Sequence, residues 1–453
     1  MFIFSIDFVS CLVMQRKSII LLLLLFAGHL LFAQEPPRPT KAQLAWQQLE
    51  TTGFIHYGNA TPKTFNPSGF DARQIIRVFR DAGLKMAIIT AKHHGGFCLW
   101  PSKYTAFSVA SSPWKNGQGD VVKEIADACR EYGIKFGIYL SPWDKNAPSY
   151  GTPAYNDLFK NQLRELLTNY GEVAEVWFDG YKGKGAKPMD YDYPGFFRLV
   201  RSLQPNAVIF SDIGPDVRWV GNEKGNASET NWSTINIKAG MLPGAVSPAY
   251  LNRGDPAGAQ WIPAETDVSI RPGWFYNPAH DTLIKSGKTL VDIYYRSVGR
   301  NSNLLLNVPP NSKGVISDAD IASLRDFRSI LDETFRTNLA AGSVPASLTD
   351  GQLQTFEIIP EGGSVVFDLK GKREFDRMLL QENIADGQRL AAAKVEYWDG
   401  KTWRRLAGFT TVGYKRLLRF PLVRTGRVRL TVEAAKWPVE LAEVGFYKAS
   451  GRE

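Results

Sequence analysis

Cysteine is scarce in this chain, which has only three in 453 residues. Cys11 precedes an apolar run near the start, so Cys98 and Cys129 are the two that can belong to the folded body. A protein of this size with two cysteines does not depend on a disulfide framework. Cys98 follows a predicted strand and Cys129 falls within a predicted helix, and we interpret both as buried thiols.

Several motifs that carry common chemistries are also missing. No GxGxxG follows an early strand, which argues against a dinucleotide-binding fold. No HxH or HExxH supplies zinc ligands at the usual spacing, and no GxSxG elbow presents a serine nucleophile. We therefore expect neither a cofactor nor a metal.

Runs of one charge are absent as well. The net charge is +9, but the basic residues are dispersed and form nothing longer than Lys-Arg or Arg-Arg pairs. A surface of this kind is solvated and does not form a nucleic-acid patch, so we expect no nucleic-acid partner. The oligomeric state stays open.

One apolar run, Ile19 to Leu25, follows a short basic start at Met14. It ends in a small residue, Ala33, and is too short for a membrane span. We interpret residues 1–33 as a signal peptide cleaved after Ala33, with either Met1 or Met14 as the true start. This predicts a secreted or periplasmic protein without a membrane span.

The body of the chain, residues 34–337, alternates between amphipathic helices and buried strands. Such repeats indicate a parallel sheet covered by helices, and their number favours an α/β fold of the (β/α)8-like, TIM-type barrel kind. Few helical stretches occur over residues 213–285, which predicts an irregular barrel there. Residues 338–453 instead show short alternating strands, typical of a C-terminal β-sandwich.

Catalytic groups of such barrels lie at the C-terminal ends of the strands. Polar side chains at the predicted strand ends are His56, His93, His94, Tyr139, Asp179 and Asp212. Three of the five histidines of the chain fall in this set. The set indicates carboxylate chemistry, with histidines and aromatic rings presented to a polyhydroxylated substrate.

Four segments in this order, FIHYG, KHHGGFCLW, GIYLSPWD and VWFDG, resemble glycoside hydrolase family 29, the retaining α-L-fucosidases. The resemblance implies hydrolysis of terminal α-linked L-fucose from a fucosylated oligosaccharide or glycoconjugate, through a covalent fucosyl-enzyme intermediate. It implies that Asp179 is the nucleophile. It also implies fucose-binding roles for His56, His93, His94, Tyr139 and Trp177.

Two glutamates compete for the role of acid/base. Glu223 lies in a Gly-flanked loop, and Glu265 lies in a predicted strand that enters an aromatic turn. The RWVGNE loop of Glu223 resembles the subgroup that cleaves α-1,3/1,4-linked fucose, and we choose Glu223. Trp274, in that aromatic turn, is a candidate wall against the C6 methyl of fucose. Trp143 and Asp144 are weaker candidates for contact with the leaving-group sugar.

Other readings remain. The chain could be a broad-specificity α-L-fucosidase, or a fucose-binding protein with weak catalysis. In the β-sandwich, Trp398 and Trp403 flank an Asp-Gly turn. These two rings could form a sugar platform, although a domain that only braces the barrel is the favoured interpretation.

Overall fold

The structure is a computed structural model, and it describes residues 35–453 apart from 58–59, 239–240, 242 and 344. The predicted signal peptide, 1–33, lies outside the described residues. No helix in the described part of the chain has both the length and the apolarity needed to cross a membrane. Export of the protein therefore remains a prediction.

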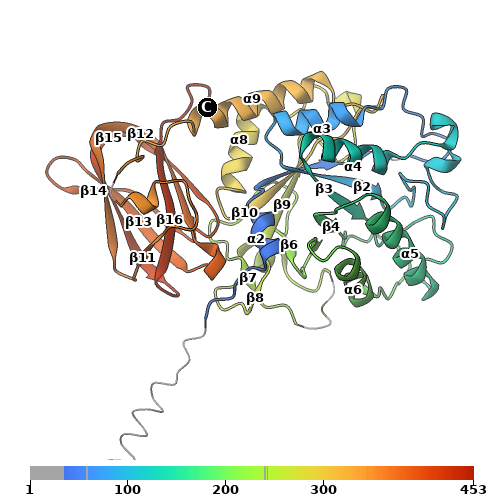
Figure 1. The fold of residues 1–453 in the computed structure, drawn as a ribbon, viewed down its shortest axis with the longest axis horizontal. Coiled ribbons are helices and arrows are strands. Elements are labelled where there is room, and N and C mark those ends of the chain that lie inside the picture. The colour runs from blue at the N-terminus through green and yellow to red at the C-terminus, as the bar shows by residue number, and fades with distance from the viewer. Residues whose placement is uncertain (1–34, 58–59, 239–240, 242, 344) are drawn as a thin grey trace, which may run out of the picture. The chain divides into compact units, whose positions relative to one another are not determined.

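Eight parallel strands close into a barrel, which confirms the predicted fold class (Figure 1). The strands are β1 (Thr51–Ile55), β2 (Met86–Lys92), β3 (Lys135–Leu140), β4 (Glu175–Trp177), β5 (Val208–Ser211), β6 (Val217–Trp219), β9 (Ala264–Ser269) and β10 (Ser302–Asn307). The barrel closes where β1 pairs with β10, and Phe54 lies opposite Asn307 in that register.

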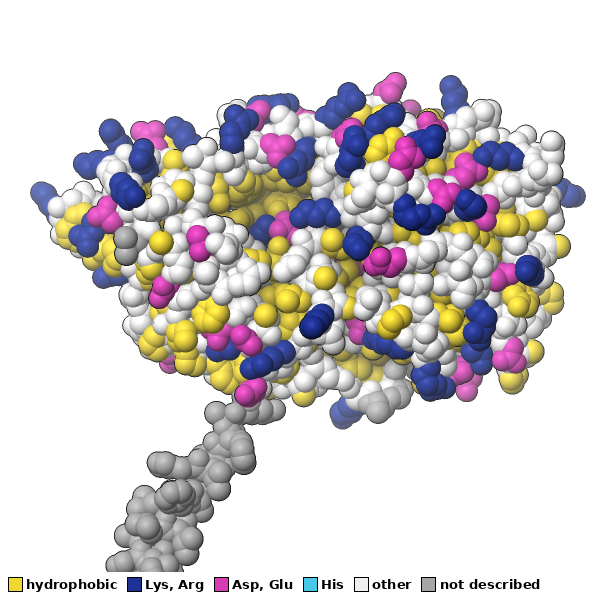
Figure 2. All heavy atoms as spheres, in the orientation of Figure 1, with side chains coloured by type: hydrophobic (Ala, Val, Ile, Leu, Met, Phe, Trp, Pro, Cys, Tyr) yellow, Lys and Arg dark blue, Asp and Glu magenta, His cyan; other side chains and the backbone are white. Residues whose placement is uncertain are grey.

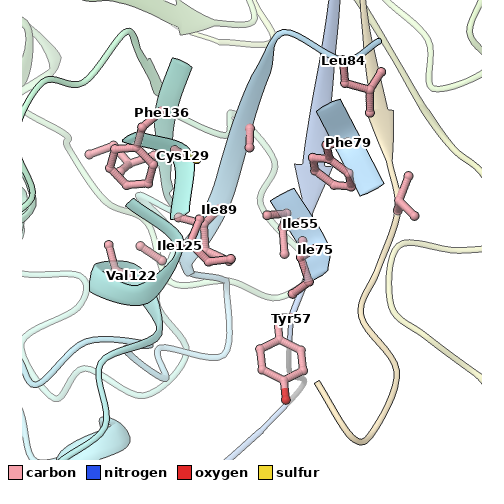
Figure 3. Close-up of a cluster of buried hydrophobic side chains, with 14 of the residues drawn as sticks. Ile55, Tyr57, Ile75, Phe79, Leu84, Ile89, Val122, Ile125, Cys129 and Phe136 are labelled. Carbon is pink, nitrogen blue, oxygen red and sulfur yellow. The ribbon is translucent and has the colours of Figure 1, made fainter. Parts of the chain in front are cut away.

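Helices cover the outside of the barrel. They are α3 (Ala72–Asp81), α4 (Val121–Tyr132), α5 (Ala154–Asn169), α6 (Tyr193–Leu203), α8 (Gly287–Arg296) and α9 (Asp318–Thr334). The helix α2 (Lys41–Gln47) instead covers the N-terminal end of the barrel, where Trp46 packs with interior side chains and donates to Glu175. Ser317 is the N-cap of α9, because its side chain accepts a hydrogen bond from the backbone N–H of Asp320. Figure 3 shows how Ile75 and Phe79 of α3 pack towards Ile55 on β1. Burial of such side chains is the main force that holds the helices on the barrel.

The segment after β5 is irregular, as expected. A short turn joins β5 to β6, where a covering helix would otherwise lie. Between β6 and β9 the chain forms a small antiparallel pair, β7 (Thr234–Ile235) with β8 (Gln260–Trp261), and the six-residue helix α7 (Pro248–Arg253). This part of the chain is therefore free to supply loops at the rim of the barrel.

The C-terminal part is an antiparallel β-domain that matches the expected β-sandwich. Its strands are β11 (Glu357–Ile359), β12 (Ser364–Glu382), β13 (Leu390–Trp398), β14 (Trp403–Thr410), β15 (Arg416–Ala435) and β16 (Val439–Tyr447), in the order β11-β16-β12-β15-β13-β14. The long strands β12 and β15 shift register twice, which lets them bend around a separate core that includes Phe367, Phe375 and Phe446.

Polar contacts join this sheet to the barrel. The Glu50 carboxylate, at the entrance to β1, accepts hydrogen bonds from Tyr414 and Lys415 of the C-terminal sheet. At a second contact, the Asn231 backbone N–H donates to Thr411 Oγ1 at 2.9 Å, and the hydroxyls of Thr230 and Thr410 share a hydrogen bond at 3.0 Å. The sheet thus holds both a barrel strand and the loop that precedes β7.

Charged side chains are spread over the molecule. Figure 2 shows Lys and Arg side chains interspersed with Asp and Glu across the visible face. The two cysteines of the described chain, Cys98 and Cys129, are buried free thiols, as predicted.

Helix α3 lies so close to β1 that a side chain on Gly53 has no room. A Cβ there would come within 2.2 Å of the Phe79 ring, which is fully buried. We expect Gly53→Ala to lower the free energy of unfolding by ~1–3 kcal/mol, because the ring must leave its packed position. Thermal and urea unfolding measure this. Gly95→Ala is the control, since a Cβ there meets nothing within 4 Å, and equal stability of the two variants would contradict the tight packing.

Candidate active site

A cavity of about 500 Å³ opens at the C-terminal ends of the barrel strands. It is lined by Phe54, His56, His93, His94, Tyr139, Trp177, Asp179, Tyr181, Asp212, Trp219, Glu223, Asp267, Trp274 and Phe275. The eight residues chosen for catalytic or fucose-binding roles lie in this set, and so does Asp212, whereas the alternative candidates Glu265, Trp143 and Asp144 do not. The cavity therefore brings together residues from seven strands or the loops that follow them.

Asp179 stands two residues after the end of β4, with its side chain 20% exposed. The Tyr139 hydroxyl donates to its Oδ2 at 2.8 Å, and the Tyr181 backbone N–H donates to its Oδ1 at 2.7 Å. Both donors favour the ionised carboxylate, but burial outweighs them and raises the pKa of Asp179 to about 7. Asp212 and Glu223 add to the rise because their negative charges repel a third one.

Three more carboxyl groups share the cavity. Burial raises the pKa of Asp212, at the end of β5, to about 6. Asp267 on β9 is 4% exposed, and burial followed by the Glu223 charge raises its pKa well above the usual range. Glu223 itself is exposed, and it makes no hydrogen bond or ion pair within the described residues. Among the residues that line the cavity there is no Lys or Arg, so the histidines and the aromatic donors face this acidic group.

The close packing around Gly180 explains why the residue after Asp179 is a glycine. A Cβ at this position would come within 2.5 Å of both carboxylate oxygens of Asp212. The backbone N–H of Gly180 also bonds the Asp212 carboxylate and lowers its pKa. The Asp-Gly pair thus lets two carboxylates from neighbouring strands lie at one rim.

Glu265 lies outside the cavity, in the barrel interior. It is 1% exposed, and its Oε2 accepts a hydrogen bond from Trp177 Nε1 at 2.9 Å. Burial, together with the charge of Glu175, raises its pKa well above the usual value. Because Trp177 lines the cavity, Glu265 acts on the site through the indole and does not reach it directly.

The tautomer of His56 is fixed by Asn307. The amide nitrogen of Asn307 donates to Ser269 Oγ at 2.8 Å and to the Trp274 carbonyl at 2.9 Å. The amide oxygen is therefore left to accept from His56 Nδ1, 2.9 Å away, so that nitrogen carries the proton. Burial keeps the pKa of His56 well below its ordinary value. The other nitrogen, Nε2, is a hydrogen-bond acceptor.

His94 is oriented in the same way. Ser141 donates its hydroxyl to the Trp143 carbonyl at 2.6 Å, so its oxygen accepts from His94 Nδ1 at 2.8 Å. His94 Nε2 then lies 3.6 Å from Asp179 Oδ2. Burial, with the neighbouring His93 and Lys145 charges, lowers the pKa of His94 to about 3. Burial lowers that of His93 to about 4, so all three cavity histidines are neutral at neutral pH.

Aromatic rings form the floor and walls. Trp177 stacks on Phe210 with ring centroids 4.0 Å apart, and it stacks on Tyr139 at 5.3 Å. Trp274 packs 5.2 Å from the His56 ring on the opposite part of the rim. These flat apolar faces suit the C–H surfaces of a sugar ring, whereas the neutral histidines suit its hydroxyls.

Some lining residues were not predicted as site residues. Asp267 lies two positions after Glu265 on β9, and this period of two could have indicated it. Trp219 belongs to the RWVGNE loop, and its Nε1 donates to Asp267 Oδ1 at 2.9 Å. Tyr181 and Phe275 lie in loops, where no periodic signal exists.

The Trp143-Asp144 pair does not face the cavity. Trp143 is 7% exposed, and Asp144 is 4% exposed. The Asp144 carboxylate instead accepts a hydrogen bond from the buried Lys92 ammonium at 3.0 Å, and Lys92 also donates to Gln162 at 2.9 Å. Lys92 directly precedes His93 and His94 in sequence, so this buried ion pair anchors the turn that carries the two histidines.

Two further expectations concern other groups. The described residues contain no cluster of three or more His, Cys, Asp or Glu side chains able to hold a metal ion, and the expectation of a metal-free site stays a prediction.

In the C-terminal sheet, Trp398 and Trp403 meet edge to face at 5.5 Å, and the Arg429 guanidinium lies 4.5 Å from the Trp403 ring centre. Arginine therefore covers the face that a sugar platform would use.

Comparison with known proteins gives a consistent result. A family model described as alpha-L-fucosidase matches residues 40–333. The chain is 45% identical over 432 residues to a putative alpha-L-fucosidase 1 of Oryza sativa subsp. japonica, covering 88% of this chain and 83% of that protein. A putative alpha-L-fucosidase structure from Bacteroides ovatus is 44% identical, with a TM-score of 0.83 and coverage of 91% and 74%. A Ruminococcus gnavus GH29 fucosidase in complex with fucose is 32% identical, with a TM-score of 0.83 and coverage of 92% and 97%.

The raised pKa of Asp179 has a consequence for stability. Its pKa is about 7 in the folded protein and about 3.9 in an unfolded chain, so the unfolded state loses this proton first as pH rises. Stability therefore falls between about pH 4 and pH 7. Between pH 5 and pH 8 we expect the free energy of unfolding to fall by about 2 kcal/mol less in Asp179→Asn than in wild type, because the asparagine cannot ionise. Urea unfolding at both pH values tests this, with the exposed Asp190→Asn as control; parallel losses in all three proteins would contradict it.

The Asn307 contact predicts a change at His56. In Asn307→Asp a carboxylate replaces the amide oxygen beside Nδ1, and it stabilises the imidazolium. We expect the pKa of His56 to rise by about 1 unit or more, measured by NMR titration of labelled histidine. Asn206→Asp, an exposed change outside the cavity, should leave the His56 titration where it is in wild type. An unmoved His56 pKa in Asn307→Asp would contradict the contact between Asn307 and His56 Nδ1.

Proposed function

The chain belongs to the α-L-fucosidase family of glycoside hydrolases, and on this premise we propose that it is a retaining exo-α-L-fucosidase. It releases terminal α-linked L-fucose from glycans by double displacement. The observation that carries the proposal is the position of Asp179. This carboxylate lies in a sugar-sized cavity, held by two hydrogen bonds and flanked by neutral histidines.

Binding comes first. The neutral His56 and His94 present Nε2 as an acceptor, so each can take the proton of a fucose hydroxyl. The Trp177 and Trp274 rings offer apolar faces, and Trp274 is the proposed wall against the C6 methyl group. Hydroxyls that donate to these nitrogens fix the sugar, while a group that cannot donate would leave a buried acceptor unpaired.

Asp179 is the proposed nucleophile. Its carboxylate oxygen attacks the anomeric carbon as the bond from that carbon to the leaving oxygen breaks, giving a covalent fucosyl ester. The Tyr139 hydroxyl and the Tyr181 N–H hold the carboxylate in place during the attack. In the second step water attacks the same carbon and releases Asp179.

Glu223 is the proposed acid/base. It gives its proton to the leaving oxygen in the first step and takes one from water in the second. Two observations support it over Glu265. Glu223 lines the cavity, whereas Glu265 is buried behind Trp177. In addition, no cation or donor among the described residues holds the Glu223 carboxylate, so it is free to exchange a proton.

The proposed linkage preference, α-1,3 and α-1,4, rests on the resemblance of the RWVGNE loop that carries Glu223. Trp219 of that loop is tied to Asp267, and the backbone N–H of Gly225 donates to the Asp267 carbonyl at 3.2 Å. The proposed acid is thus carried on a loop with fixed ends. A broad-specificity enzyme would hydrolyse α-1,2, α-1,3, α-1,4 and α-1,6 fucosides at similar rates. Comparing these four linkages decides between the two.

We propose that residues 1–33 are a signal peptide and that the enzyme acts as a secreted or periplasmic protein. Mass measurement of the mature N-terminus tests that part of the proposal, and a chain that retains residues 1–33 would contradict it.

Azide tests both carboxylates. We expect Asp179→Ala to lower the hydrolysis of an aryl fucoside on the order of 10⁴-fold or more, with azide giving the β-fucosyl azide. Glu223→Ala should lose ~10²–10⁴-fold on poor leaving groups, with azide giving the α-fucosyl azide from the covalent intermediate. NMR of the products distinguishes the anomers.

Glu265→Gln is the matched control, since it keeps a hydrogen-bond acceptor for Trp177 and should give no azide product. An α-fucosyl azide from this variant and not from Glu223→Ala would reverse the assignment. Near wild-type activity of Asp179→Ala would overturn the mechanism. Fucose binding without release of fucose by the wild-type protein would instead establish the fucose-binding alternative.

A further inference from the structure

Tyr181 is unusual among the residues that line the cavity. Its side chain is 60% exposed, while most of the other aromatic residues of the cavity are buried or half-buried. Within the described residues its hydroxyl makes no hydrogen bond, so the ring contributes little that would explain its place in the fold. A large aromatic face left in water at a cavity mouth is a surface that a ligand can cover.

The ring is nevertheless held in position. Its centroid lies 5.4 Å from that of His94 and 5.8 Å from that of Trp143, and Trp143 is buried behind it. Its own backbone N–H donates to Asp179 Oδ1. The exposed ring is therefore fixed relative to the carboxylate that attacks the sugar, and it lies on the outer side of that carboxylate.

Cations flank the same part of the mouth. The Lys145 ammonium lies 4.6 Å from the Trp143 ring centre, and the Lys182 ammonium lies 4.5 Å from that of Tyr191. Both lysines are exposed. The mouth thus offers one flat apolar face, the Tyr181 ring, and two exposed lysines lie over rings near it without lining the cavity. That combination suits a pyranose ring, which has an apolar C–H face and a rim of hydroxyls.

We propose that Tyr181 forms the subsite for the leaving-group sugar, where the pyranose attached to fucose stacks on the exposed ring. The proposal rests on the proposed function and names the residue that selects a sugar leaving group. Trp143 does not contact this sugar directly, because it is buried; it supports Tyr181 from below. Tyr181 is a specificity residue and takes no part in bond breaking.

Two substrates separate the leaving-group subsite from the fucose subsite. A fucosylated trisaccharide has a sugar leaving group, whereas α-L-fucosyl fluoride has none. We expect Tyr181→Ala to lower the ratio of kcat/KM for the trisaccharide to kcat/KM for the fluoride by 10-fold or more. Tyr181→Phe and Tyr181→Trp, which keep a flat ring, should hold that ratio within about 3-fold of wild type.

Product inhibition provides an independent readout. The defucosylated disaccharide should inhibit wild type and Tyr181→Phe competitively, and its inhibition constant should rise by 10-fold or more in Tyr181→Ala. Tyr104→Ala is the matched control, because Tyr104 is also an exposed tyrosine, at 46%, but lies outside the cavity.

The outcomes are distinct. Equal losses on both substrates, or an unchanged inhibition constant in Tyr181→Ala, would overturn the stacking role while leaving the fucosidase intact. A wild-type protein that releases fucose from neither substrate would overturn the proposed function itself.

Discussion

Closure of the barrel between β1 and β10 is the constraint on which the site depends. The register that pairs Phe54 with Asn307 brings the two ends of the barrel sequence together. It thereby places Asn307 beside His56, although 251 residues separate them. Every other functional strand end then faces the same opening, because parallel strands in a closed barrel share one rim. The chemistry of the cavity is a consequence of where that ring closes.

The second determinant is the absence of cations from the cavity lining. Asp179, Asp212, Glu223 and Asp267 gather there with no Lys or Arg among the described lining residues. Burial and mutual repulsion raise the pKa of the aspartates, and burial keeps the histidines uncharged. In the proposed mechanism the recognition of sugar hydroxyls is therefore separate from the titration of the carboxylates. The proposal gives the hydroxyls to the neutral imidazoles with fixed tautomers, while the Tyr139 hydroxyl and the Tyr181 backbone N–H hold the Asp179 carboxylate.

The sequence predicted the barrel, its irregular segment and the C-terminal sheet, because hydrophobic periodicity and turn residues are local signals. It also predicted the strand-end residues of the cavity, since their position follows from the strands. It did not reveal the partners that orient them. Asn307 fixes His56 and Ser141 fixes His94 through contacts across the barrel, and no local pattern encodes such a contact. Likewise, the sequence could not show that Glu265 on β9 faces the barrel interior while Glu223 lines the cavity.

The grip of the C-terminal sheet on Thr230 and Asn231 has a consequence for how this protein can vary. Those residues follow the loop that carries Glu223, and they are hydrogen-bonded to Thr410 and Thr411 of the sheet. The C-terminal sheet thus helps to fix the position of the segment that follows this loop. A barrel recombined with a foreign C-terminal module would keep the Asp179 side of the cavity whole, but the loop of Glu223 would lose these hydrogen bonds. The two parts are therefore expected to be exchanged in evolution only as a pair.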